Sequence, residues 1–134
     1  MTAALIQNSE GEILIARRRL DAPVEAGKWE FPGGKVEEGE HPEVGLVREI
    51  REELGFEIAV EKFFELSSHV YALPGKSLHI VLLAYHCRVV SGEPQAIDVA
   101  EYRWIQLPQL ANFDFAAADL LFIAKLKREG LKLP

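Results

Sequence analysis

The chain has little material for covalent cross-links or for membrane insertion. Its 134 residues include one cysteine, Cys87, so no disulfide can form within the chain. Cys87 lies in an apolar, strand-like run, where we expect a buried and unreactive thiol. No apolar run approaches the length of a membrane span, and no signal peptide precedes the first expected strand. We therefore expect a cytoplasmic protein.

The chain also lacks an excess of positive charge. Its 15 Lys and Arg residues oppose 21 Asp and Glu residues, and the net charge of −6 argues against general nucleic-acid binding through a basic surface. A phosphate-containing substrate is not excluded, because bound divalent cations would reverse the local field. The sequence contains no repeat and no linker, so we expect residues 1–134 to form one globular domain.

One segment in the middle of the chain carries regularly spaced acidic residues. Pro42 to Leu54 is predicted to be a helix, because proline suits the first helical position and Gly55 is placed to end it. Glu49, Glu52 and Glu53 would share one face of this helix. Like charges at such spacing destabilise a helix by about 0.2–0.5 kcal/mol. A solvated acidic face is the alternative, but the pattern favours a bound cation, Mg²⁺ or Mn²⁺, which prefers hard oxygen ligands.

These glutamates belong to a longer motif. It runs from Gly34 to Phe56 and reads G-x5-E-x7-R-E-U-x-E-E-x-G-U, where U is a bulky apolar residue; the segment Trp29-Glu30-Phe31-Pro32-Gly33-Gly34-Lys35 overlaps its start. Over nearly its whole length the chain resembles the Nudix hydrolases, in particular their MutT-type branch. The resemblance implies an α/β fold, the Nudix α/β/α sandwich with a mixed β-sheet between helices. It also implies hydrolysis of nucleoside triphosphates to a monophosphate and pyrophosphate.

The resemblance assigns the metal to residues in and beside the motif. Glu49, Glu52, Glu53 and the Gly33 carbonyl are expected to bind it. Arg48 lies one turn before Glu52 and is expected to orient the site rather than to stabilise the helix.

A further carboxylate is expected on the loop before the strand that contains Trp104. Asp98, six residues before this tryptophan, is our first choice, and Glu101 is the alternative. A water held by the metal and by a carboxylate would attack a phosphorus in line. Asp98 and the three glutamates of the motif are all candidates for the general base.

Substrate recognition is expected outside the motif. In MutT-type enzymes the base contacts an arginine, a phenylalanine and a polar residue near the last helix, and Arg18, Phe31 and Asp119 match these positions. Leu78 stands where well-known relatives place an arginine, and Ile80 is expected to line the same pocket. An ionised Asp119 would accept hydrogen bonds from guanine, cytosine or adenine, and a protonated one could also donate.

The sequence leaves several functional alternatives open. We favour a guanine nucleotide, dGTP or 8-oxo-dGTP, over CTP or dCTP. Nucleotide sugars and dinucleoside polyphosphates remain alternatives, as does a non-catalytic domain that senses a nucleotide or binds a partner. The expected partner is a small-molecule nucleotide, without a membrane or general nucleic-acid binding, and the oligomeric state is a monomer or a homodimer.

The remaining elements follow from local patterns. Alternating apolar residues predict strands at Ala3–Ile6, Ile13–Ala16, Ile58–Leu66, Leu78–Val90 and Tyr102–Ile105. A final helix is predicted from Phe115 to about Arg128, with Asp114 as its cap and Gly130 beyond its end.

Overall fold

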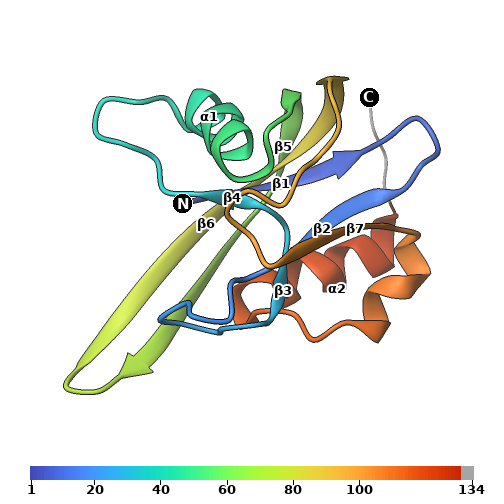
Figure 1. The fold of residues 1–134 in the computed structure, drawn as a ribbon. Coiled ribbons are helices and arrows are strands. Elements are labelled where there is room, and N and C mark those ends of the chain that lie inside the picture. The colour runs from blue at the N-terminus through green and yellow to red at the C-terminus, as the bar shows by residue number, and fades with distance from the viewer. Residues whose placement is uncertain (131–134) are drawn as a thin grey trace.

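One mixed β-sheet organises the protein. The computed structural model describes residues 1–130 and contains a seven-stranded sheet (Figure 1). The strands are β1 (Thr2–Gln7), β2 (Ile13–Arg17), β3 (Trp29–Glu30), β4 (Gly33–Gly34), β5 (Glu57–Leu73), β6 (Lys76–Ser91) and β7 (Glu101–Ile105). Five of them lie in the order β3-β2-β1-β6-β5, while β4 pairs with β1 and β7 pairs with β2. β1 and β6 are parallel, and the other pairs are antiparallel.

Helices cover both faces of this sheet. On one face, α1 (Pro42–Leu54) buries Leu46, Ile50 and Leu54 in an apolar cluster that includes Ile6 of β1. On the other face, α2 (Leu120–Glu129) packs in a second cluster that includes Leu5. Neighbouring residues of β1 enter opposite clusters because successive side chains of a strand point to opposite faces. The expected α/β sandwich is confirmed.

The first helix has the bounds that the sequence predicts. Its first turn is capped by His41, whose Nδ1 accepts a hydrogen bond from the Glu43 amide at 3.2 Å. Its last turn ends at Gly55, which adopts a left-handed backbone (φ 68°) and donates its amide to the Arg51 carbonyl at 3.0 Å. Glycine adopts this conformation without steric cost, so the helix stops before Phe56 enters the core.

The predicted start of the last helix is wrong. Phe115 forms a parallel bridge with Trp29, and the Ala116 amide donates to the Trp29 carbonyl at 2.9 Å. The chain is therefore extended where a helix was expected. A 3-10 helix, η2 (Ala117–Asp119), follows, and α2 begins only at Leu120. Contact with distant β3 overrides the local helical pattern, and Asp114 does not act as a side-chain cap. A further 3-10 helix, η1 (Leu107–Asn112), precedes this segment.

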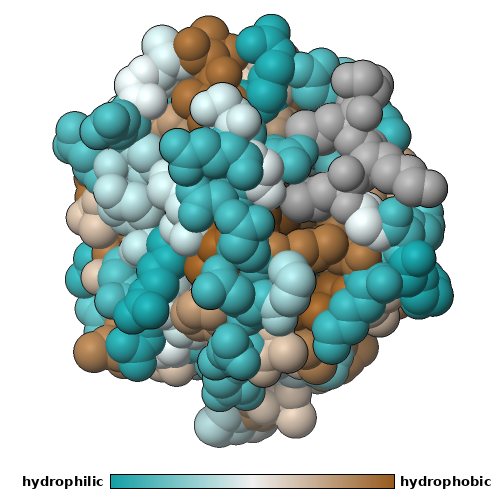
Figure 2. Space-filling view, turned by 90° about the vertical axis from the view of Figure 1, so that its right-hand side faces the viewer, coloured by the Kyte–Doolittle hydropathy of each residue, from teal (hydrophilic) through white to brown (hydrophobic). Residues whose placement is uncertain are grey.

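The β5–β6 hairpin is longer than predicted and forms an arm that projects from the body (Figure 1). Regular pairing continues from Leu66 opposite Leu83 to Leu73 opposite Lys76. The sequence pattern missed this part because Ser67, Ser68 and a histidine interrupt the apolar alternation. The opposite end of the molecule is mostly hydrophilic, with hydrophobic patches between polar side chains (Figure 2).

Cys87 is fully buried, as predicted, and burial raises the pKa of its thiol. Within residues 1–130, no helix has the length and apolar character needed to cross a membrane.

The buried His86 ring makes the folded state sensitive to acid. His86 is 3% exposed, its ring packs edge-on against Phe64 at 4.9 Å, and its Nδ1 has no hydrogen-bond partner. Burial, with the charges of Lys62 and Lys125, lowers the pKa of His86 to about 4. The unfolded chain, in which histidine titrates near 6.5, therefore binds more protons between these two values. The contribution of His86 to stability is therefore complete above about pH 6.5 and is lost as the pH drops toward 4.

We predict that lowering the pH from 7 to 5 removes about 2 kcal/mol of unfolding free energy through His86. The variant His86→Phe should lose this contribution, because phenylalanine binds no proton. Urea unfolding of both proteins at the two pH values measures the difference. Equal pH dependence in the wild type and the variant would contradict the prediction.

Candidate active site

Two glutamates of α1 face the glycine turn that precedes the helix. Glu49 and Glu53 line a cavity of about 310 Å³, the glutamate cavity, together with Gly33 and Gly34. A Cβ atom on Gly34 would clash with the Glu49 carboxylate, and one on Gly33 would clash with the Thr2 backbone. Glycine at position 34 therefore lets the backbone approach the Glu49 carboxylate closely, and glycine at position 33 lets β4 lie close against β1.

Glu53 lies in an unfavourable environment for a charged group. Its Oε2 atom is buried without a hydrogen-bond partner. Burial, followed by the charges of Glu30, Glu49 and Asp98, raises the pKa of Glu53 to about 9. A cation would relieve both the burial and the repulsion, because it supplies an opposite charge and a ligand position for the free oxygen.

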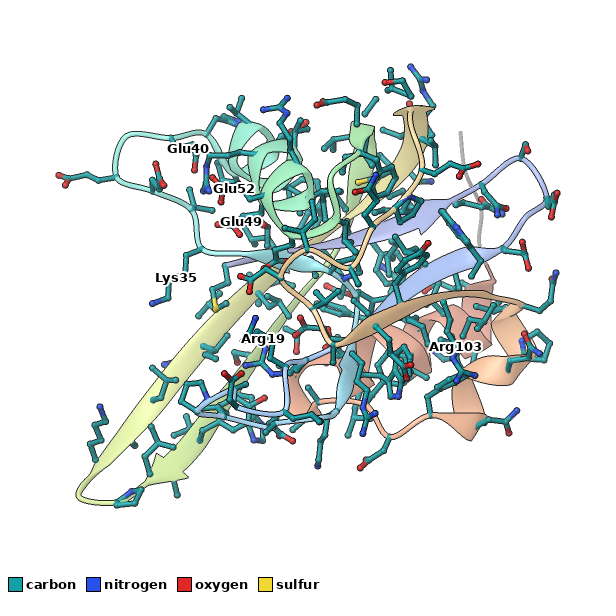
Figure 3. All side chains as sticks on the ribbon, viewed as in Figure 1. Arg19, Lys35, Glu40, Glu49, Glu52 and Arg103 are labelled. Atoms are coloured by element: carbon teal, nitrogen blue, oxygen red, sulfur yellow. The ribbon has the colours of Figure 1, made fainter. Side chains whose placement is uncertain are left out.

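Arg48 joins the glycine turn to the helix. Its Nε and one terminal nitrogen donate to the two oxygens of Glu40 at 2.8 and 3.0 Å, and the same terminal nitrogen donates to the Lys35 carbonyl at 2.9 Å. Its other terminal nitrogen donates to Glu49 at 2.9 Å and to Glu52 at 3.2 Å. These bonds lower the pKa of Glu40 to about 2. Arg48 thus orients Glu49, and the labelled acids gather beside α1 in Figure 3.

The acids of the motif do not form a ready-made metal cage. Within the described part of the chain, no three His, Cys, Asp or Glu side chains are grouped so that they could hold an ion. Glu52 is exposed, pairs with Arg48 and does not line the glutamate cavity. The residues present still fit a divalent cation that keeps several waters and phosphate ligands, because Glu49 and Glu53 offer hard oxygens beside the Gly33 backbone.

Asp98 reaches the opposite side of Glu53. Both residues line a further cavity of about 310 Å³, the Asp98 cavity. The Asp98 amide donates to the Glu53 carbonyl at 3.0 Å, and the Asp98 carboxylate accepts from Arg19 at 3.3 Å. Glu101 lies in β7 instead and forms an ion pair with Arg17 at 3.9 Å. The geometry therefore favours Asp98 over Glu101 as the additional carboxylate.

A larger cavity adjoins the glutamates. This arm cavity, about 590 Å³, lies between the β5–β6 arm, the loop that follows β2 and the η2 turn. The expected recognition residues Arg18, Leu78, Ile80 and Asp119 all line it. Phe31 is buried against Phe115 and lines the adjoining glutamate cavity. The structure therefore brings the expected recognition residues to the side of the carboxylates.

Asp119 is the most deeply buried acid of this region. It is 3% exposed, and one of its carboxylate oxygens has no hydrogen-bond partner. Burial, with the charge of Glu30, raises the pKa of Asp119 well above its usual range, and Arg18 opposes this shift. Burial therefore favours the neutral form of Asp119, which would offer both a donor and an acceptor to a ligand.

Sequence patterns missed Glu30, which connects the cavities. Glu30 lines the glutamate, Asp98 and arm cavities, as Arg18 does. An Arg18 nitrogen donates to Glu30 at 2.9 Å, yet burial raises the pKa of Glu30. The one available indication was an acid between two buried aromatic residues, Trp29 and Phe31. Tyr71 also lines the arm cavity.

A more voluminous groove lies elsewhere on the surface. A groove of about 800 Å³ is lined by Arg88, Tyr102, Trp104 and the turn at Gly92, and no glutamate of the motif reaches it. Its greater volume does not make it the active site, because it lacks the convergent acids and the glycine backbone.

Comparison with known proteins agrees with this geometry. The NUDIX domain family matches residues 2–126. An 8-oxo-dGTP diphosphatase from Escherichia coli (strain K12) is 39% identical over 128 residues, which cover 96% of this chain and 95% of that enzyme. A CTP pyrophosphohydrolase from the same organism is 37% identical over 120 residues, or 90% of this chain and 84% of that enzyme.

Solved structures of similar proteins have the same fold. The crystal structure of a MutT protein from Methanosarcina mazei Go1 superposes with a TM-score of 0.77 at 28% identity, over 98% of this chain and 94% of that one. Hydrolases of this family generally need a divalent metal ion, in agreement with the acids described above. The chain belongs to the Nudix hydrolase family.

Proposed function

We propose that this enzyme hydrolyses (deoxy)nucleoside triphosphates to a nucleoside monophosphate and pyrophosphate, with Mg²⁺ as the metal. The observation that carries the proposal is that the glutamate cavity and the arm cavity adjoin each other. Glu49 and Glu53 converge on the glycine turn, and the arm cavity with Asp119 opens directly beside them. A triphosphate on the acids would leave its nucleoside in the arm cavity.

The metal would be held by Glu49, Glu53 and the Gly33 carbonyl, with Glu52 and Asp98 as further ligands or as ligands of bound water. Bound there, Mg²⁺ would activate a water and neutralise charge on the phosphates. The chain itself contributes positioning: Arg48 fixes Glu49 on one side, and the Asp98 amide fixes its loop to the end of α1.

We favour a guanine nucleotide as the substrate, with cytidine nucleotides as the alternative. In its neutral form, which burial favours, Asp119 would donate through its O–H and accept through its carbonyl oxygen. This pair complements guanine O6 and N1–H, and it also complements cytosine N3 and its amine. The arm cavity, at about 590 Å³, has room for a purine. The two relatives named for 8-oxo-dGTP and for CTP support the same two candidates.

Replacement of Glu53 by glutamine tests whether the protein catalyses hydrolysis with this residue. Glu53→Gln keeps the shape of the side chain but removes its charge, so we expect kcat to fall by roughly 100-fold or more. The melting temperature should not fall, because the change also removes repulsion from Glu30 and Glu49. Pyrophosphate release with Mg²⁺ across the four dNTPs, 8-oxo-dGTP and CTP gives the measurement. Glu10→Gln, in an exposed turn, is the control. Unchanged turnover in Glu53→Gln would mean that Glu53 has no catalytic role, and absence of turnover in the wild type would favour a non-catalytic domain.

A metal titration separates the two candidates for the additional carboxylate. Asp98→Asn should weaken Mn²⁺ binding about tenfold, since second or outer ligands commonly have effects of that size. Glu101→Gln, whose side chain pairs with Arg17, should leave Mn²⁺ binding unchanged. Electron paramagnetic resonance of free Mn²⁺ reports binding without turnover. The opposite order of effects would assign the role to Glu101.

Substitution of Asp119 tests whether this residue recognises the nucleobase and so acts as the base reader. An amide also offers one donor group beside one acceptor, so Asp119→Asn should preserve the ranking of bases. Asp119→Ala removes both, and the kcat/KM ratio between the best and the worst base should shrink at least tenfold. The measurement is kcat/KM on the same nucleotide panel. If Asp119→Ala keeps the wild-type ratio, Asp119 does not read the base.

A further inference from the structure

The turn that carries Asp119 is too short to hold itself in place. η2 spans three residues, Ala117–Asp119, and no side chain of the turn caps its start. Two of its backbone groups are bonded to distant segments. The Ala117 amide donates to Glu25 at 3.3 Å, and the Ala118 carbonyl accepts from the buried Ser67 hydroxyl at 2.7 Å. The position of Asp119 is therefore set by the β2–β3 loop and by β5.

Glu25 has an unusual backbone for its residue type. Its φ is 53°, in the left-handed region, and within the described residues the other positive φ angles all belong to glycines. A residue with a Cβ atom adopts this region at an energetic cost, and such costs gather at functional sites. A glycine would fit the backbone better, so the side chain is what this position provides.

The Glu25 side chain is fixed at both of its oxygens. One oxygen accepts from the Ala117 amide, and the other pairs with Lys28 at 2.9 Å. The carboxylate is only 13% exposed, and Glu25 lines the arm cavity beside Asp119. The side chain is largely shielded from water, and its carboxylate is held between the turn and Lys28.

The loop that carries Glu25 is itself anchored to the recognition residues. The Arg18 side chain donates to the Val24 carbonyl at 3.0 Å, and the same guanidinium pairs with Glu30. The Lys28 amide donates to the Glu25 carbonyl at 3.2 Å, which closes the turn in which the strained residue lies. Glu25 thus connects a rigid loop to the turn that carries Asp119.

We propose that Glu25 is a positioning residue that holds the Ala117–Asp119 turn at the arm cavity and thereby sets which nucleobase Asp119 accepts. This inference rests on the proposed role of Asp119 as the base reader. Glu25 touches the turn and acts through it, and it takes no part in the attack on phosphorus.

Three substitutions separate the side chain of Glu25 from its backbone. Glu25→Gln keeps an acceptor oxygen, so base discrimination should stay within about twofold of the wild type. Glu25→Ala and Glu25→Gly both remove the hydrogen bond, so the kcat/KM ratio between guanine and cytosine nucleotides should fall about tenfold in both, chiefly through KM. Of the two variants that lose the bond, only Glu25→Ala retains the backbone strain, so it should melt at a lower temperature than Glu25→Gly.

Hydrogen exchange of the Ala117 amide gives a readout that does not depend on activity. It should become at least tenfold faster in Glu25→Gly and Glu25→Ala, and stay slow in Glu25→Gln. Glu10→Gly, in the exposed β1–β2 turn, controls for loss of a carboxylate and should match the wild type in both measurements. A wild-type kcat/KM ratio or slow Ala117 exchange in Glu25→Gly would overturn the proposal.

Asp119→Ala, measured beside these variants, distinguishes the two hypotheses. If Asp119→Ala reduces discrimination and Glu25→Gly does not, Glu25 has no positioning role although Asp119 reads the base. If neither reduces it, the base-reading role of Asp119 fails and this inference fails with it, whatever the Ala117 exchange shows.

Discussion

The structure depends on the placement of several carboxylates in a small, largely buried region that contains few basic side chains. Glu30, Glu49, Glu53 and Asp119 all line the glutamate cavity, where Arg18 and Lys35 are the basic residues. Repulsion and burial raise the pKa values of Glu30, Glu53 and Asp119. Folding alone gains nothing from such an arrangement, since unpaired buried acids cost free energy. Binding of a cation and a polar ligand accounts for it.

Two arginines divide this region into a chemical part and a recognition part. Arg48 bonds to Glu40, Glu49 and the Lys35 carbonyl, and so fixes the motif helix to the glycine turn. Arg18 bonds to Glu30 and the Val24 carbonyl, and so fixes the loop beside the arm cavity. Both arginines use planar, multidentate hydrogen bonding, for which lysine would be a poor substitute.

Local patterns explain what could be predicted from the sequence. The bounds of α1 follow from Pro42 and Gly55. The side-by-side Glu49 and Glu53 and the Arg48–Glu52 pair follow from helical spacing, which involves residues three or four positions apart. The start of α2 and the role of Glu30 could not be predicted in this way. They depend on Trp29 meeting Phe115 and on several acids sharing one cavity, contacts between segments that are distant in the sequence.

The same distinction explains why an intact motif does not determine the substrate. The motif builds its site from a single helix and the turn before it, so it can remain constant while the rest of the chain changes. The arm cavity instead combines the β2–β3 loop, the hairpin arm and the η2 turn, and its acid is placed by Glu25 and Ser67. Relatives named for 8-oxo-dGTP and for CTP are similarly close to this chain. A few changes in these long-range contacts would therefore be enough to change the base while the phosphate chemistry stays the same.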